Sequence, residues 1–414
     1  MKKKAVALAV GALFAAPAVQ AQITMGNETI GTVQIYGKLY PEFLVAKGQG
    51  STQGGAGVSN LVSANGVLPG GAVQDHGQRN GVDSQNTYIG FRGERGLGGG
   101  LKGIWQIEQS VELDGQNQGL WSSRNSFAGL SHNLAGTVKL GKMDTIYKEY
   151  GDTFSMFGIA SGNFISASNV LSQIGIGRGA ASRFHERWNN TIQYQTAEFA
   201  GFQAGIQYLP DEQRGDPGKA TNVNGYSYGV KWDSKVVYVS LHQEIHNDAF
   251  GASTNITDAT RTNTGNANAR SRDMATRLSG EFRFAGQRIT VDIARLHYTE
   301  TGQTTTGKFL EYKKPNWAVG YETNIGPVGL ATQYIRAGSG TCQLTGGVDC
   351  TTDGLEAWMW TLGARYRFDR QTFIYVIASK LANGASARMD NWNNADPNRG
   401  EDIKQAAIGI SYSF

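Results

Sequence analysis

The sequence has few of the features that mark most soluble proteins or helical membrane proteins. Its 2 cysteines allow at most one disulfide, and its 8 prolines in 414 residues leave few points at which a strand must break. Beyond its first residues, no apolar run reaches the roughly 20 residues that a membrane-spanning helix needs. A formal net charge of +4 is too small to suggest a nucleic-acid partner.

The N-terminal segment has the pattern of an export signal. Three consecutive lysines precede an apolar stretch over residues 5–16, and small residues follow at 18–21. This order predicts a signal peptide over residues 1–21, cleaved after Ala21. The alternative, a transmembrane anchor, is disfavoured because the apolar stretch is short. Loss of the three lysines would lower the net charge from +4 to +1, and residues 22–414 would form a single domain.

The composition of the remaining chain is unusual for a soluble protein of this size. Glycine contributes 56 residues and aromatic residues 10%, yet the mean hydropathy is negative. An outer-membrane β-barrel reconciles these values, because half of each strand faces lipid, half faces water, and no segment is apolar on average. A secreted β-sandwich or β-helix is the soluble alternative.

Apolar residues alternate with small or polar ones in several segments, most plainly at the C-terminus. In QAAIGISYSF, Ala406, Ile408, Ile410, Tyr412 and Phe414 share one parity, and small or polar residues share the other. The same period occurs in GFQAGIQYL, KVVYVSLHQEIH and EAWMWTLGARYRF. Successive side chains of a strand point to opposite faces, so this period predicts strands with one apolar face.

The connections between the candidate strands alternate between short and long. Sixteen candidates cover residues 33–46, 82–93, 100–112, 121–131, 136–144, 186–196, 200–209, 224–232, 235–246, 274–284, 287–299, 307–323, 327–337, 354–368, 371–380 and 403–414. Tight turns, as at 233–234 and 326–327, alternate with polar loops, as at 47–81, 247–273 and 381–402. This asymmetry is typical of a membrane barrel, whereas a sandwich would mix its connections. The prediction is an all-β fold: a transmembrane up-and-down antiparallel β-barrel of 16 strands.

Two prolines conflict with this strand assignment. Pro41 falls in the first candidate strand and Pro315 in the twelfth, where each removes a hydrogen-bond donor from the ladder. We expect a bulge or a shifted strand boundary at both positions.

Four segments carry a resemblance to a known family: VQIYGKLY, TYIGFRGERGLGGGLKGIWQIE, SSRNSFAGLSHNLAGTVKLGK and the aromatic C-terminus. Along the whole mature chain the sequence resembles the general diffusion porins of Gram-negative bacteria, most of all their neisserial and β-proteobacterial branch. The resemblance implies a non-enzymatic homotrimer in the cell outer membrane, in contact with outer-membrane lipid and lipopolysaccharide. Each subunit would hold a water-filled pore for small hydrophilic solutes and ions, and no cofactor is implied.

The resemblance also implies an inward-folded third external loop that narrows the pore, here about residues 145–185. Asp152 supplies an acid in the middle of that loop. Met156, however, stands where enterobacterial relatives often carry glutamate. The family's basic pore wall, opposite the loop, matches Lys38 and Arg124 in this sequence.

Alternation extends this set of lumen-facing charges. In the first strand Val33 and Leu39 point outward, so Lys38 points inward. In the fourth strand, Phe127 is expected to face lipid and Arg124, with the small residues Ser126 and Ala128, to face the lumen. The complete predicted constriction has the bases Lys38, Arg92, Arg124, Lys139 and Arg187 and the acids Asp152, Glu149 and Glu108.

Two other residue groups could carry chemistry. His242, Glu244 and His246 share one strand face, but alternate residues lie roughly 6.6 Å apart, which suits shared metal coordination poorly. We therefore expect polar lumen residues there and no metal site. Cys342 and Cys350 fall in one external loop of an exported protein, so we expect a disulfide that stiffens that loop without holding the barrel together.

Two functions remain open from the sequence. The first is a general diffusion porin, with a mild preference for anions because five lumen bases outnumber three lumen acids. The second is a substrate-specific channel for phosphate or organic anions. No nucleophile with a base partner is apparent, so catalysis is not expected. An open, ohmic conductance would favour the first function, and saturable block by one solute would favour the second.

Overall fold

The computed structural model consists mainly of β-strands. It describes residues 23–27, 31–52, 59–64, 75–84, 86–113, 124–157, 164–176, 184–210, 212, 223–248, 268–391 and 397–414. The predicted signal peptide, residues 1–21, lies outside these ranges. No helix among the described residues is both long and apolar enough to span a membrane.

The strands are β1 (Ile23–Asn27), β2 (Gly31–Leu39), β3 (Glu42–Gln49), β4 (Arg79–Asp83), β5 (Tyr88–Gly98), β6 (Leu101–Ser110), β7 (Ser126–His132), β8 (Gly136–Asp144), β9 (Arg187–Gln195), β10 (Phe202–Leu209), β11 (Asn224–Asp233), β12 (Val237–Asn247), β13 (Arg270–Phe284), β14 (Gln287–Thr301), β15 (Phe309–Ile325), β16 (Val328–Ala337), β17 (Thr341–Leu344), β18 (Ala357–Arg367), β19 (Thr372–Asn383) and β20 (Asp402–Ser413). Short helical segments lie between them: α2 (Asn60–Ala64), α3 (Ile146–Gly151), α4 (Ser168–Leu171) and η2 (Thr345–Gly347).

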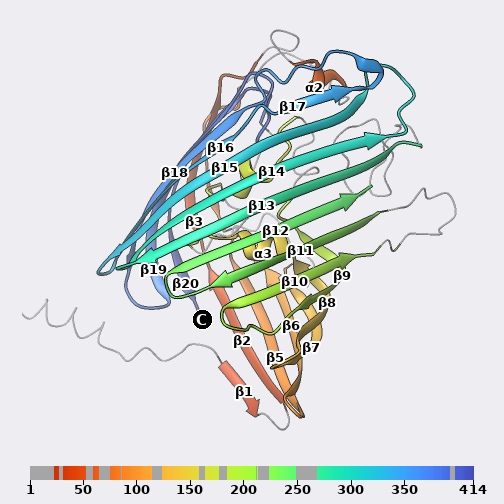
Figure 1. The fold of residues 1–414 in the computed structure, drawn as a ribbon. Helices are drawn as coiled ribbons and strands as arrows, with labels where there is room; N and C mark the ends of the chain where they lie inside the picture. Colours follow the sequence, from red (N-terminus) through yellow and green to blue (C-terminus); the bar gives the residue numbers. More distant parts are fainter. Residues whose placement is uncertain are drawn as a thin grey trace, which may run out of the picture.

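The sheet is antiparallel throughout and closes on itself, with the strands running obliquely around the wall (Figure 1). The closing strand β20 pairs with β19 on one edge and with β3 on the other, from Asp402 opposite Gln49 to Gly409 opposite Glu42. At its end, Phe414 exchanges two backbone hydrogen bonds with Gly37 of β2. Closure leaves no open edge in the wall, which is what a sheet surrounded by lipid requires.

The described strands fill sixteen positions in this wall, as predicted. Three positions are each built from two consecutive strands, namely β2 with β3, β4 with β5, and β16 with β17. Strand β1 pairs only with β2 and lies outside the closed circuit.

Both prolines lie where the ladder changes partner. Pro41 separates β2 from β3, opposite the break between β4 and β5, so the first candidate strand is two strands rather than one. Pro315 lies inside β15, at the point where its neighbour changes from β16 to β17. The carbonyl of Pro315 accepts from Gly338 N at 2.8 Å. Gly338 lies in the connection between β16 and β17, so the N–H that proline lacks would face this connection and not a paired strand.

In β7, the fourth strand of the wall, the predicted assignment of residues to the inner and outer faces is wrong, because the two faces are exchanged. Strand β7 exposes Ala128 and Leu130, whereas Phe127 pairs with Gly141 and lies 5.2 Å from the Lys139 ammonium on the inner face. The expected strand began at residue 121, but β7 begins at Ser126. Arg124 lies before the strand, so alternation does not govern the direction of its side chain.

The short connections match the predicted turns. Strands β11 and β12, β13 and β14, and β15 and β16 are joined by two or three residues at one end of the barrel. The turn from β5 to β6 uses Gly98, Gly99 and Gly100, at φ values of +92°, +59° and +84°. Side chains other than glycine rarely adopt such angles, which explains the glycine run in GLGGG.

The wall has the reverse of the usual polarity of a soluble protein. Its outer face exposes large apolar side chains, such as Val230 (54%), Ile293 (55%) and Ile408 (62%). On the opposite parity, buried residues are polar, for example Ser227 (0%) and Asp292 (1%). A chain that exposes its apolar residues in a continuous band and hides its polar ones is suited to a lipid surrounding.

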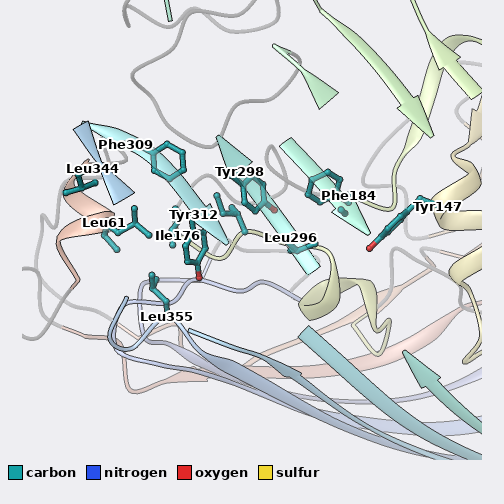
Figure 2. Packing of buried hydrophobic residues seen from close by; sticks show 13 residues of the cluster. Leu61, Tyr147, Ile176, Phe184, Leu296, Tyr298, Phe309, Tyr312, Leu344 and Leu355 are labelled. Carbon is teal, nitrogen blue, oxygen red and sulfur yellow. The ribbon is translucent and has the colours of Figure 1, made fainter. Parts of the chain in front are cut away.

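Buried apolar residues inside the barrel come from loops and from the wall strands on which those loops pack. One cluster joins Leu61 of α2, Ile176 and Phe184 to the strand residues Tyr298 and Tyr312 (Figure 2). Its other buried members are Val62, Tyr147, Ile174, Ala275, Leu296, Phe309, Leu344 and Leu355. The core of this molecule therefore lies between loops and wall, not between two sheets.

The reversed polarity predicts the outcome of placing a charge on the outer face. Ile293→Lys, near the middle of β14, should destabilise the folded barrel in lipid by about 2–4 kcal/mol, because the ammonium would face hydrocarbon. The control Thr304→Lys adds the same charge on an exposed loop. Urea titration in lipid vesicles measures the free energy of unfolding of both variants. Equal stability of the two variants would mean that β14 does not face lipid.

Candidate functional site: charged residues on the inner face

The helix α3 is attached to the inner face of neighbouring strands. The side chain of Thr145 caps it, accepting from Lys148 N at 3.2 Å. Tyr147 N donates to Ser227 Oγ of β11 (2.8 Å), and Tyr238 and Ser240 of β12 both donate to the carbonyl of Tyr150. Burial raises the pKa of the Tyr147 phenol above its usual value, so this side chain stays neutral.

The residues after α3 hydrogen-bond to strands further around the barrel. Thr153 Oγ1 donates to Asp292 Oδ2 of β14 at 3.1 Å. Ser155 N and Met156 N both donate to Glu322 Oε1 of β15, at 2.9 and 2.8 Å. One carboxylate thus binds two successive backbone amides, a charge-assisted arrangement that fixes this part of the segment firmly.

The described residues 164–176 continue along the same face. Their carbonyl groups accept hydrogen bonds from side chains of β15, β16 and the residues before β20. The donors are Lys314, Asn316, Gln333 and Asn391. Lys314 Nζ, fully buried, reaches the carbonyl of Ile174 at 3.1 Å.

Three residues of the predicted constriction form one group. The Arg124 guanidinium pairs with the Glu108 carboxylate, which also accepts from the Tyr36 hydroxyl at 2.9 Å. Arg124 lies 4.7 Å from the ring centroid of Tyr88, and the Lys38 ammonium lies 5.7 Å from the same ring. Glu108 therefore lies among the bases, on the same side of the barrel.

Arg92 and Lys139 contact neutral groups. Arg92 donates to the Gln34 side chain and lies 4.7 Å from the Tyr36 ring. Within the described residues, neither Arg92 nor Lys139 has a carboxylate within ion-pair distance. The charge of Arg92 is therefore less compensated than that of Arg124, whereas Lys139 lies within electrostatic range of Glu149 and Asp144.

The remaining predicted residues surround the two ends of the segment 145–185. Arg187 pairs with Asp144 at 2.9 Å, and Glu149 accepts from Gln195 at 2.8 Å. Asp152 pairs with the buried His185 at 2.8 Å. Arg92 shares Tyr36 with the group around Glu108, and Lys139 lies within electrostatic range of Glu149 and Asp144. The eight predicted charges therefore do not form a single cluster: some gather around Glu108, and the others lie near the two ends of this segment.

Several charged residues of the inner face were missed by the sequence reasoning. Asp144 binds both Arg187 and Lys148, and Arg277 pairs with Asp292 at 2.9 Å while both are buried. A further group contains Glu281, Arg283, Arg288, Glu322 and Arg365. Alternation could have placed these residues inward except Asp144, which shares the parity of the outward Val138 and Leu140 and lies beyond a register shift in β8. Their pairing depends on strand register, which the sequence does not reveal.

Two smaller predictions concern a disulfide and a row of histidines. Cys342 and Cys350 form the expected disulfide, which packs against the cluster of Figure 2. His246 bonds to Glu244 at 2.9 Å, and no group of three or more potential metal ligands occurs among the described residues. The disulfide loop also holds α2, because Asn60 Nδ2 donates to the Asp349 carbonyl at 2.6 Å.

Fold and inner face together define an outer-membrane β-barrel with a polar interior. A family model for the Gram-negative porins matches residues 5–384, and the chain belongs to that family. The predicted resemblance and the location in the outer membrane are thereby confirmed.

Individual relatives match shorter parts of the chain. It is 33% identical to major outer membrane protein P.IB of Neisseria lactamica over 144 residues, which are 34% of this chain and 38% of that protein. It is 30% identical to protein P.IA of Neisseria meningitidis serogroup C over 129 residues, 31% of this chain and 30% of the relative. The matches thus span 38% and 30% of these two relatives.

Solved structures agree over nearly the whole chain. An anion-selective porin from Comamonas acidovorans matches with a TM-score of 0.66 and 19% identity, covering 93% of this chain and all of that one. Outer-membrane expressed OmpT of Vibrio cholerae matches with a TM-score of 0.62 and 14% identity, covering 95% of this chain and 100% of that one. At such identities these likenesses establish the fold alone.

Proposed function

We propose that this protein is a non-enzymatic, water-filled channel through which small hydrophilic solutes and ions diffuse passively. The observation that carries the proposal is the inner face of a closed barrel lined with polar and charged side chains. Transport through such a channel needs only a suitable width and a suitable electrostatic field at its narrowest point. Membership of the porin family supports the same function.

We infer that the segment 145–185 narrows the pore. Its described parts are hydrogen-bonded to inner-face side chains of β11, β12, β14, β15 and β16. The opposite wall, formed by β2 and β5–β9, carries most of the predicted bases. Solutes would pass between this segment and that wall.

The expected selectivity is a mild preference for anions. Pairing with Glu108 and Asp144 offsets much of the charge of Arg124 and Arg187. Arg92 lacks such a partner among the described residues, and Lys139 forms no ion pair there although Glu149 and Asp144 lie near it, so we expect a small positive surplus on this wall. Screening acts over about 10 Å at 0.1 M salt, so water in the pore limits the surplus to a bias and does not allow exclusion of cations.

Zero-current potentials in a KCl gradient across a planar bilayer test this proposal. Wild-type protein should show anion preference, and Arg92→Glu should move the potential toward cation preference, because the lumen loses two units of positive charge. The control Arg95→Glu makes the same change on the same strand, but on the outer parity. Absence of ion conductance would contradict the channel function; a clearly cation-selective wild type would contradict only the selectivity.

We further propose that the protein is a homotrimer. The outer face beside the closing strands is apolar and exposed in the single chain, with Leu39 at 37% and Ile408 at 62%. One of the similar solved structures, OmpT of Vibrio cholerae, is titled as a trimer form. Native mass spectrometry from mild detergent should give three subunit masses in one ion series. A series with one subunit mass would overturn the proposal.

A substrate-specific channel for phosphate or organic anions is the second candidate. A pocket lined with bases, described below, is the observation in its favour.

A further inference from the structure

A pocket of about 500 Å³ lies outside the predicted constriction, beside Ser155 and Met156. It opens near the short turns, since the connection from β13 to β14 and the residue Lys235 both line it. Arg283, Arg288 and Arg365 also line it, and Glu322 is the one acid in its lining. Four bases therefore face one carboxylate around this space.

Two of these arginines are already committed to acids. Arg283 pairs with Asp233 and Glu281, both at 2.7 Å. Arg288 pairs with Glu322 and lies 3.7 Å from Glu281. Their fixed positions set the shape of the pocket, and their charges are largely offset.

Arg365 differs from both because its partners are neutral. Its guanidinium donates to the Met156 carbonyl and, at 3.3 Å, to Asn324 Oδ1. No carboxylate of the described chain forms an ion pair with it, and its Nε is buried without a hydrogen-bond partner. The side chain lies over Gly329, where a Cβ would come within 2.8 Å of that Nε.

The number of donors leaves room for a ligand on Arg365. A guanidinium carries five N–H groups. The two hydrogen bonds to Met156 and Asn324 use two of them, and the enclosed Nε accounts for a third. One N–H on each terminal nitrogen remains to donate to the oxygens of a carboxylate or phosphate, the ligands that guanidinium groups favour.

The charges nearby favour the same kind of ligand. Lys235 is exposed on the pocket lining, and Arg367 follows Arg365 on the same strand face. Neither has an ion-pair partner among the residues that the structure describes. Because Arg365 is partly buried, its attraction for an anion is screened less than that of a surface arginine.

We propose that this pocket binds a small oxyanion, either a small organic carboxylate or inorganic phosphate, with Arg365 as the main contact and Lys235 beside it. The proposal rests on the channel function and adds to it a binding site on the short-turn side of the segment 145–185. An anion that has passed the narrowest point would be held there briefly. Its occupancy would make the pore current saturable.

The test is block of chloride current through the wild-type channel by two probes, inorganic phosphate and succinate, each at constant ionic strength. Both should reduce the current with a saturable dependence on concentration. Arg365→Gln should raise the half-blocking concentration roughly tenfold, the effect of losing one charge-assisted hydrogen-bonding group. Arg365→Lys keeps the charge but loses the planar guanidinium. Its half-blocking concentration should lie between those of the wild type and Arg365→Gln.

The matched control is Lys231→Gln, which removes one positive charge from the inner face outside the pocket. Its half-blocking concentration should stay within twofold of the wild type. Block by one probe alone would restrict the site to that ligand class. An open channel that neither probe blocks, or an equal shift in Lys231→Gln, would overturn the site while leaving the channel function intact. A protein without any conductance would instead overturn the proposed function.

Discussion

Closure of the sheet between β20 and the broken strand β2–β3 is the constraint on which the rest of the structure depends. In hydrocarbon, an unpaired backbone group costs several kcal/mol, so an open strand edge is not tolerated. The chain meets this requirement up to its last residue, since Phe414 exchanges hydrogen bonds with Gly37. Once the circuit is closed, the alternation of side chains assigns every residue of the wall to lipid or to the interior.

The interior then has to be filled and its charges compensated. The wall itself supplies polar side chains, and residues 145–157 and 164–176 use them as hydrogen-bond partners for their backbone. Glu322 is the clearest example, because it binds two amides of the segment and one arginine of the wall. Where compensation is complete, as for Arg277 and Asp292, the charges are buried. Where it is incomplete, as for Arg92 and Arg365, we propose that the charges attract passing anions.

Much of the fold could be predicted from the sequence because a membrane strand reports its environment residue by residue. The period of two, the short turns and the long loops were enough for the sixteen positions and for the closing role of the C-terminus. The prediction went wrong at β7, where Phe127 is the first large apolar residue of the segment but faces inward. Phe127 and Leu130 have opposite parities, so alternation alone does not decide which of them faces lipid.

The site was less predictable because its pairs join residues distant in sequence. Alternation could place Arg365 on the inner face, but only the structure brings it to the carbonyl of Met156. Likewise, Asp144 could be assigned to a strand end, yet its two basic partners come from α3 and β9. Register and the path of a loop without a period of its own decide these contacts, and neither follows from local pattern.

Wall side chains hold the residues after α3 against the inner face, and we propose that this segment thereby narrows the pore. Single-channel conductance of Glu322→Ala tests this most directly, since that change removes the acceptor of Ser155 N and Met156 N. The control Glu311→Ala breaks ion pairs on the outer parity of the same strand. The account predicts a larger and noisier unit conductance for Glu322→Ala and an unchanged one for Glu311→Ala. Identical unit conductance in wild type and Glu322→Ala would contradict it.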